Sequence, residues 1–289
     1  MRKGILLLGG MGKRFLPATS IINKHLIPII DRPMFHFSLS TLILSGISKI
    51  NIISNKETLN LIRKSIGAGK HLGLNLSYTV QKEAKGIPEG IMLSKKFIGK
   101  SDFALMLGDN FFYSSDLSEK LSKINNSKKN TILTYRVKNP SDFGVLISKN
   151  KKIKKIIEKP KKFYSNLVVT GLYFYQNSVL NLLKDLKPSS RNEFEITDFN
   201  NLIIKKKQLH EYELGRGSVW LDSGTPDNHL KTSEFVRILE ERTNKKIGLL
   251  EEVVFQKKMI DKNQFKNIIK KLDNAYPSKN YLRDLLKKN

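Results

Sequence analysis

The sequence predicts an α/β fold with a Rossmann-like, mostly parallel mixed sheet, a β-rich excursion in the middle and a helical C-terminal tail. Over residues 1–128, short apolar runs alternate with segments of helical periodicity, which is typical of parallel strands covered on both faces. From residue 129 strand-like segments follow one another with little helix between them, and beyond residue 244 apolar residues recur at helical spacing. The 289 residues, 39% of them apolar, suffice for one large core.

The first part is expected to form four strands joined by three helices. The opening strand is the apolar run from Gly4 to Leu8, and the first helix ends at Gly46. Pro88 suits the first turn of the third helix. We expect strands at residues 4–8, 49–54, 76–80 and 103–107, and helices at residues 35–47, 57–66 and 88–97.

The middle part is expected to be mainly β, and the end helical. We expect strands at residues 130–137, 144–148, 153–158, 167–175, 208–214 and 219–221, and helices at 178–186 and 193–206. From Thr225 the pattern is helical, with breaks near Asn244 and around Tyr276-Pro277. We therefore expect a main domain of residues 1–244, made of parts at about 1–128 and 129–244, and a tail of residues 245–289.

The composition excludes several kinds of site. The chain has no cysteine, which excludes disulfides, zinc–thiolate sites and thiol nucleophiles. No apolar run approaches the roughly 18 residues of a membrane-spanning helix. Met1-Arg2-Lys3 passes straight into a strand without a signal-peptide pattern. We therefore expect a cytoplasmic protein with no membrane partner.

The net charge of +26 comes almost wholly from lysine, since only 10 of the 52 basic residues are arginine. Surfaces that read nucleic acid favour arginine, whose planar fork binds phosphates and base edges through two hydrogen bonds. We therefore expect no specific nucleic-acid partner, although polyanions should attract the chain at low salt.

A glycine-rich turn follows the first strand and is the strongest functional signal. Its glycines are Gly9, Gly10 and Gly12, and the cations after it are Lys13, Arg14 and Lys24. Glycines let backbone N–H groups point at an anion, and the cations add charge, so the pattern favours polyphosphate binding over a plain surface turn. The spacing matches neither G-x-x-x-x-G-K-[ST] nor G-x-G-x-x-G.

Two aspartates stand at the ends of predicted strands. Asp109 follows the strand at 103–107, and Asp222 follows the strand at 219–221. Ligands bind at the carboxyl ends of strands in open parallel sheets. Two carboxylates over a triphosphate suit Mg²⁺, although either one alone would suit a cap or turn.

The glycine turn resembles the G-x-G-[TK]-R-x-x-P…K signature of the sugar-phosphate nucleotidylyltransferases, most of all the glucose-1-phosphate thymidylyltransferases. Here it reads Gly10, Gly12, Lys13, Arg14, Pro17 and Lys24. Further motifs of that family follow in the same order from about Lys3 to about Glu241. The resemblance implies Arg14, Lys24, Asp109 and Asp222 as catalytic residues, with Asp109 and Asp222 holding Mg²⁺. It implies a nucleotide site of Leu7, Gly9, Gly10, Gly12, Lys13, Arg14, Lys24, Gln81, Gly86 and Asp109.

The resemblance also implies a sugar-phosphate site. Its residues are Gly144, Glu158, Lys159, Val169 and Tyr173. Glu158 would accept from sugar hydroxyls and Lys159 would bind phosphate, although the pair is also compatible with a solvated strand end. The segment Arg191 to Asp198 resembles a family segment beside the sugar pocket, and we expect it to be partly structural.

The implied reaction is nucleotidyl transfer from dTTP to glucose 1-phosphate, giving dTDP-glucose and pyrophosphate for dTDP-deoxysugar and polysaccharide synthesis. Three departures from the family pattern, His25, Pro88 and Glu89, leave the base preference open. The alternatives are UTP or another sugar 1-phosphate, a basic RNA-binding protein, and a catalytically weakened regulatory paralogue.

The tail carries three groups of apolar residues at helical spacing, centred near residues 250, 268 and 284. Short helices of this kind must bury their apolar faces on the main domain or on another subunit. The tail-bearing members of the family form tetramers with a second, regulatory product site. We therefore expect a homo-oligomer, most simply a tetramer.

Overall fold

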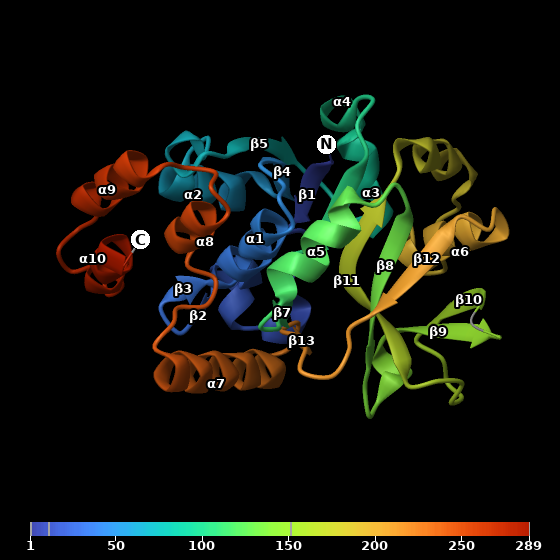
Figure 1. Cartoon of the computed structure of the whole chain (residues 1–289). Coiled ribbons are helices and arrows are strands. Elements are labelled where there is room, and N and C mark those ends of the chain that lie inside the picture. The colour runs from blue at the N-terminus through green and yellow to red at the C-terminus, as the bar shows by residue number, and fades with distance from the viewer. Residues whose placement is uncertain (1, 11, 151, 289) are drawn as a thin grey trace.

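The computed structural model describes residues 2–10, 12–150 and 152–288, so Met11 of the glycine turn and Lys151 of a lysine run lie outside the described residues. The centre of the molecule is a nine-stranded mixed sheet with helices on both sides (Figure 1). None of the helices in the described ranges is long and apolar enough to cross a membrane.

The main path of the sheet has the order β10-β9-β11-β6-β1-β4-β5, with β8 paired to β11 and β12 paired to β8. The strands β1, β4, β5 and β6 are parallel, whereas β11 joins β6 antiparallel and also pairs with β8 and β9. The predicted fold class is confirmed. The strands are β1 (Lys3–Leu7), β2 (Pro28–Ile29), β3 (Arg32–Pro33), β4 (Lys49–Ser54), β5 (Asn75–Val80), β6 (Phe103–Leu107), β7 (Asn110–Tyr113), β8 (Asn130–Arg136), β9 (Gly144–Lys149), β10 (Lys152–Glu158), β11 (Leu167–Tyr175), β12 (Leu209–Glu213) and β13 (Val219–Asp222).

Helices cover the sheet, and the C-terminal end of the chain is helical. In Figure 1, α8, α9 and α10 lie at the side of the molecule opposite β9 and β10. The helices are α1 (Met34–Leu44), α2 (Lys56–Ile66), α3 (Ile87–Leu93), α4 (Lys95–Ile98), α5 (Leu117–Asn126), α6 (Ile196–Lys205), α7 (Pro226–Thr243), α8 (Leu250–Gln256), α9 (Lys262–Lys271) and α10 (Lys279–Lys288).

The central strand β1 is buried on both faces. Ile5 and Leu7 belong to the hydrophobic cluster on one face, and Leu6 and Leu8 belong to the cluster on the other. Side chains alternate between the faces of a strand, so a strand covered on both faces is a continuous apolar run. Since β1 and β6 are parallel neighbours, the turns after them emerge at the same edge of the sheet.

Three expectations about elements were wrong in detail. The helix expected at 88–97 is split at Ser94 into α3 and α4, and the segment expected at 178–186 is a 3₁₀ helix, Asn177–Asp185. The helix expected at 193–206 begins only at Ile196. The backbone before it is extended because the Phe194 N–H donates to the Lys85 carbonyl at 2.8 Å, which fixes that segment against the loop before α3.

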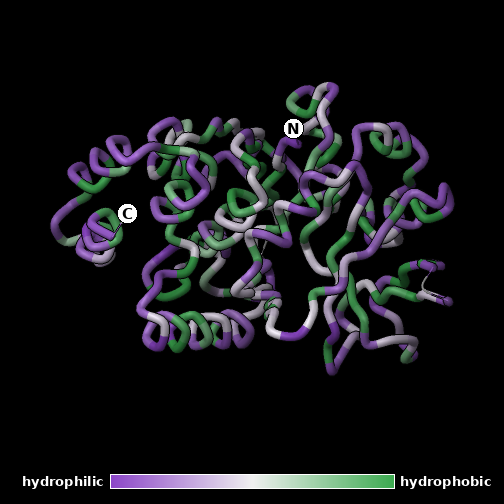
Figure 2. The backbone as a smooth tube through the Cα atoms, viewed as in Figure 1, coloured by the Kyte–Doolittle hydropathy of each residue, from purple (hydrophilic) through white to green (hydrophobic). Residues whose placement is uncertain are grey.

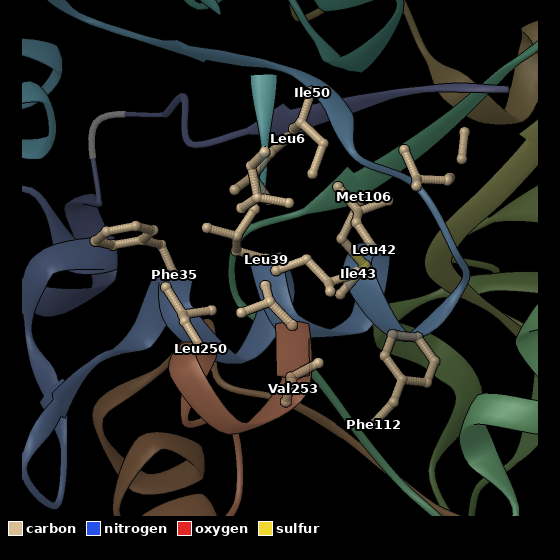
Figure 3. Close-up of a cluster of buried hydrophobic side chains, with 14 of the residues drawn as sticks. Leu6, Phe35, Leu39, Leu42, Ile43, Ile50, Met106, Phe112, Leu250 and Val253 are labelled. Carbon is tan, nitrogen blue, oxygen red and sulfur yellow. The ribbon is translucent and has the colours of Figure 1, made fainter. Parts of the chain in front are cut away.

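The tail packs on the main part of the same chain. Helix α8 contacts α1, and Figure 3 shows Leu250 and Val253 of α8 among the side chains of Phe35 and Leu39 of α1. Hydrophobic and hydrophilic residues alternate along the outer helices α7, α9 and α10 (Figure 2). Leu282 of α10 is fully buried in this same cluster. The described tail therefore buries its main apolar residues within the chain, so the subunit contact that we expected the tail to make is not needed to bury them.

Candidate functional site

Two adjoining cavities open at the carboxyl ends of β1 and β6. The first cavity, of about 330 Å³, is lined by the glycine turn after β1. The second cavity, of about 250 Å³, is lined by the start of β9, the end of β10 and the middle of β11. Both are lined by Arg14, Ile87, Leu107 and Asp109. The two spaces therefore share one boundary, and it carries both a cation and a carboxylate.

Most residues expected to bind a nucleotide come together at the first cavity. Of the expected residues, those that line it are Leu7, Gly9, Gly10, Arg14, Lys24, Gln81, Gly86 and Asp109. Gly12 and Lys13 are not among its lining residues. Gly12 has a φ of 59°, and a Cβ there would lie 2.8 Å from Thr19 Cγ2, so this glycine is needed by the turn itself.

Glycine is needed at position 9 because the Gln81 side chain lies too close for a Cβ atom there. A Cβ at position 9 would lie 2.3 Å from Gln81 Oε1. The Gln81 side chain, only 6% exposed, lies directly against the glycine turn. The Gln81 Nε2 group donates to Glu89 Oε2 at 2.6 Å. Glu89 therefore contacts a residue expected to read the base, a contact absent from the sequence prediction.

Two carboxylates and two cations meet at the boundary between the cavities. Lys24 Nζ lies 2.5 Å from Asp109 Oδ2. A Cβ built on Gly224 would lie 2.7 Å from Arg14 Nη2, 2.9 Å from Asp222 Oδ1 and 3.3 Å from Asp109 Oδ2. These three side chains therefore converge on one backbone position, which only glycine can occupy without displacing them. All four residues expected to be catalytic lie in this group.

The two carboxylates differ in their tendency to ionise. Burial opposes ionisation of Asp109, but the charge of Lys24 and hydrogen bonds from Lys24 and Asn110 outweigh it and hold its pKa well below the usual range. Burial, and next the negative charge of Asp109, raise the pKa of Asp222 to about 6. The repulsion between the carboxylates is the kind that a bound cation relieves.

Asn110 holds this group together and was not among the expected site residues. Its Nδ2 donates to Asp109 Oδ1 at 3.0 Å, and its Oδ1 accepts from Trp220 Nε1 at 2.7 Å and from the Gly171 N–H at 2.8 Å. It also lies opposite Asp222 where β7 pairs with β13. Its place directly after Asp109 at a strand end was the available signal.

The residues expected to bind the sugar phosphate all line the second cavity, and they are Gly144, Glu158, Lys159, Val169 and Tyr173. Glu158 ends β10 directly opposite Gly144 at the start of β9. Lys159 has a φ of 41°, an uncommon conformation for a residue with a side chain. Burial, with the charges of Glu158 and Asp109, raises the pKa of Tyr173, so its hydroxyl keeps its proton and can donate.

The segment from Arg191 to Asp198 has both structural and cavity-lining residues. Arg191 forms an ion pair with Glu195 at 2.9 Å, which is a contact within the segment. Thr197, in the first turn of helix α6, lines the second cavity, as expected for a segment beside the sugar pocket. Asn200, one turn further along α6, also lines it and was not expected there. The Thr197 hydroxyl donates to Glu158 Oε2 at 2.5 Å and so fixes that carboxylate.

His25 lines the first cavity next to Lys24 and Asp109. It is 2% exposed, and its Nδ1 lies 2.8 Å from Asn23 Oδ1. Burial and the neighbouring Lys24 charge lower the pKa of His25 to about 3, so its ring is neutral at pH 7. Its departure from the family pattern is therefore accommodated without adding charge to the site.

Comparisons with known proteins agree with this arrangement. A family profile described as nucleotidyl transferase matches residues 3–238. A glucose-1-phosphate thymidylyltransferase of Mycolicibacterium smegmatis is 38% identical over 271 residues, which are 93% of this chain and 94% of the relative. One of Mycobacterium tuberculosis is 37% identical and is covered over 100% of its length by 99% of this chain.

Solved structures show the same fold. A Bacillus anthracis structure described as a glucose-1-phosphate thymidylyltransferase in complex with sucrose has a TM-score of 0.75 and 35% identity, over 82% of this chain and 96% of that one. A UDP-glucose pyrophosphorylase complexed with UDP-glucose has a TM-score of 0.71 and 25% identity, over 82% of this chain and 99% of that one. With similarity in sequence and in structure over nearly the whole length of its relatives, the chain belongs to the nucleotidyl transferase family.

Proposed function

We propose that the chain transfers the thymidylyl group of dTTP to glucose 1-phosphate, giving dTDP-glucose and pyrophosphate, with Mg²⁺ as its cofactor. The observation that supports this most is the pair of cavities that share Arg14 and Asp109. A triphosphate against the glycine turn and a sugar phosphate against Glu158 and Lys159 would place their reacting phosphates at that shared boundary. Such a reaction supplies nucleotide sugars for dTDP-deoxysugar and polysaccharide synthesis.

The reaction asks for little proton chemistry. The second pKa of a phosphate monoester is about 6, so the sugar phosphate already carries an anionic oxygen at pH 7. That oxygen attacks the α-phosphorus of dTTP, the bond from this phosphorus to the β-phosphate oxygen breaks, and pyrophosphate leaves with the electron pair. Catalysis then consists of alignment and charge neutralisation, so the reaction needs no general base.

The chain's own residues supply that alignment. The glycine-turn N–H groups and Arg14 would hold the triphosphate, with Arg14 neutralising the charge that builds on pyrophosphate. Lys24 keeps Asp109 ionised and, with Lys159, screens the incoming sugar phosphate. Gln81 and Gly86 would contact the base. Glu158, fixed by Thr197, would accept from sugar hydroxyls.

The residues present fit Mg²⁺. Within the described ranges no group of three or more Asp, Glu, His or Cys side chains could hold a metal, so the protein offers the Asp109 and Asp222 carboxylates at this position. Mg²⁺ in phosphate-transfer sites is commonly held by one or two carboxylates, substrate phosphates and water. When bound, it would neutralise phosphate charge next to Arg14.

The metal assignment is tested by Asp109→Asn and Asp222→Asn. Each should lower kcat at least 100-fold at saturating Mg²⁺, because about 3 kcal/mol of transition-state stabilisation is lost. Asp116→Asn, at an exposed position with an ion pair to Lys120, is the matched control and should keep normal turnover. Near-normal turnover in either site variant would remove that residue from the metal site.

The substrates are tested by measuring pyrophosphate release over a matrix of nucleoside triphosphates and sugar 1-phosphates. We expect the highest kcat/KM for dTTP with glucose 1-phosphate. UTP is the second candidate, because the solved UDP-glucose pyrophosphorylase shares 25% identity with this chain. Release only in combinations without a pyrimidine nucleotide or without a sugar phosphate would refute the proposal.

We also propose that the chain acts in the cytoplasm, where both substrates are found, as a homo-oligomer and most simply a tetramer. Since the main apolar residues of the tail are buried within the chain, a subunit contact does not need to cover them. Leu230 and Ile238 on α7 are 60% and 54% exposed and are candidates for it. Light scattering at physiological salt should show a tetramer, and a monomer at micromolar concentration would refute this part of the proposal.

A further inference from the structure

The side chain of Gln81 is held in one orientation by Glu89. Oε2 of Glu89 accepts two hydrogen bonds, from Gln81 Nε2 at 2.6 Å and from the Lys85 backbone N–H at 2.9 Å. An ionised carboxylate can only accept hydrogen bonds. The Gln81 nitrogen must therefore face Glu89, and its carbonyl oxygen must face the other way.

The other side of the Gln81 amide is the first cavity. Gln81 Oε1 is the atom that a Cβ at Gly9 would approach to 2.3 Å, and both residues line that cavity. No donor among the described residues forms a hydrogen bond to this oxygen. The cavity wall therefore carries a fixed acceptor with a free lone pair, at the position expected to meet the base.

We propose that Glu89 is a positioning residue that fixes the acceptor oxygen of Gln81 toward the base, so that the preference of the site for a pyrimidine with an N3–H group depends on Glu89 as well as on Gln81. Thymine and uracil have this donor, whereas N3 of cytosine is an acceptor. A cytosine in the same place would set two acceptors against each other, which costs more than losing one hydrogen bond. The inference rests on the proposed nucleotide site.

Glu89 can hold Gln81 in place because the two residues are close in the sequence and in the structure. It lies in the first turn of α3, where helix N-termini favour a negative charge, and it reaches back to the end of β5. The second acceptor role, toward the Lys85 N–H, prevents the carboxylate from turning away from Gln81. A flip of the Gln81 amide would place its oxygen against this carboxylate oxygen and break the 2.6 Å hydrogen bond, so the orientation with the nitrogen toward Glu89 is favoured.

The test compares nucleotide affinities by calorimetry, with Mg²⁺, and kcat/KM by pyrophosphate release, for dTTP, UTP and dCTP. The wild type should bind dTTP and UTP at least about tenfold more tightly than dCTP. Glu89→Leu removes the acceptor and lets the amide flip, so the affinity for dTTP should fall, the affinity for dCTP should rise, and the ratio should approach one. Most of the change should appear in KM, with kcat for dTTP nearly constant.

Three further variants separate positioning from a general structural role. Glu89→Gln keeps a carbonyl acceptor and should restore most of the discrimination. Glu83→Leu is the matched control, because Glu83 is exposed and pairs only with the Lys85 side chain among the described residues. In a Gln81→Leu background, Glu89→Leu should have no further effect on the ratio. Glu89→Ala repeats the test if the leucine variant does not fold.

An equal loss of affinity for dTTP and dCTP in the Glu89 variants would overturn the inference, and so would an unchanged ratio. Because binding is measured apart from turnover, the two proposals can fail separately. A Glu89-dependent ratio without pyrophosphate release from any sugar phosphate would refute the proposed function and support the inference. Turnover with dTTP, together with a dTTP-to-dCTP affinity ratio that is the same in the wild type and the Glu89 variants, would support the proposed function and refute the inference.

Discussion

Lys24 and Asp109 form an ion pair of 2.5 Å across the two turns that follow β1 and β6, and both side chains are nearly buried, at 11% and 14% exposure. Such a pair gives little net stability, but breaking it leaves a charge without its partner. Lys24→Met should therefore lower the free energy of unfolding by about 3 kcal/mol. Urea titration of the wild type and of Lys24→Met measures this difference in the free energy of unfolding.

The ion-pair prediction has an internal control. In Lys24→Met/Asp109→Asn the unpaired charge is gone, so the double variant should be more stable than Lys24→Met alone. Lys13→Met, at an exposed position in the same turn, should change the free energy of unfolding by less than about 0.5 kcal/mol. Strictly additive effects at positions 24 and 109 would contradict this account.

Gly224→Ala should disable the site and spare the fold. The new methyl group would lie within 3.0 Å of Arg14 Nη2 and Asp222 Oδ1, which are ends of side chains and can move away. We expect kcat to fall at least tenfold, because a small misplacement of catalytic groups is costly, while the melting temperature stays close to that of the wild type. Gly215→Ala, where a Cβ would meet nothing within 4 Å, should keep full activity.

Arg14 and Lys159 should affect different kinetic constants. Arg14→Ala removes a cation that acts on the leaving pyrophosphate, so kcat should fall by two orders of magnitude or more. Lys159→Ala removes a contact to the bound sugar phosphate, so its KM should rise with little change in kcat. Steady-state kinetics against each substrate measures both. The reverse pattern would mean that the two cations serve the opposite substrates.

Glu252 should make stability depend on pH. Burial raises its pKa to about 7, and Tyr281 donates to its carboxyl oxygens at 2.9 Å; Lys245, Arg32 and Glu240 are the charged groups around it. The folded state thus holds a proton that the unfolded state releases, so this contribution is complete below about pH 4.5 and is lost as the pH rises through about 7.

Glu252→Gln stays neutral at every pH and should therefore gain stability relative to the wild type as the pH rises from 4.5 to 8, by on the order of 2 kcal/mol. Taking the difference between the two proteins removes the opposite slope that buried His25 and His36 add at acid pH. Glu57→Gln, in an exposed helix turn, is the control. A difference that does not change with pH would contradict the assignment.

The parallel core could be predicted from the sequence because its strands are buried on both faces and therefore read as unbroken apolar runs. The strands at 49–54 and 103–107 have the predicted bounds. β7 and helix α5 were missed. β7 has four residues and is held by β13, more than a hundred residues later, so no local pattern marks it.

The site residues that could be predicted from the sequence are those that belong to a recognisable motif. Gly9 and Gly10 of the glycine turn, both aspartates and Glu158-Lys159 were found in this way, and the structure brings these residues to the two cavities, whereas Gly12 shapes the turn without lining either cavity. Asn110, Thr197 and Glu89 act through hydrogen bonds to those residues, and such bonds depend on side-chain orientation. The positions of these three residues in the sequence indicate that they lie near the site. The sequence does not indicate which atoms their side chains contact.

The strand β11 sets a limit on how this protein can be re-engineered. It pairs with β6, which leads to Asp109, and with β8 and β9 on the other side, and it carries Val169 and Tyr173 of the second cavity. A chimera that took its C-terminal half from a relative would have to rebuild this ladder across the graft. Acceptance of new sugars should therefore be easier to reach by point substitutions along the cavity wall than by exchanging modules.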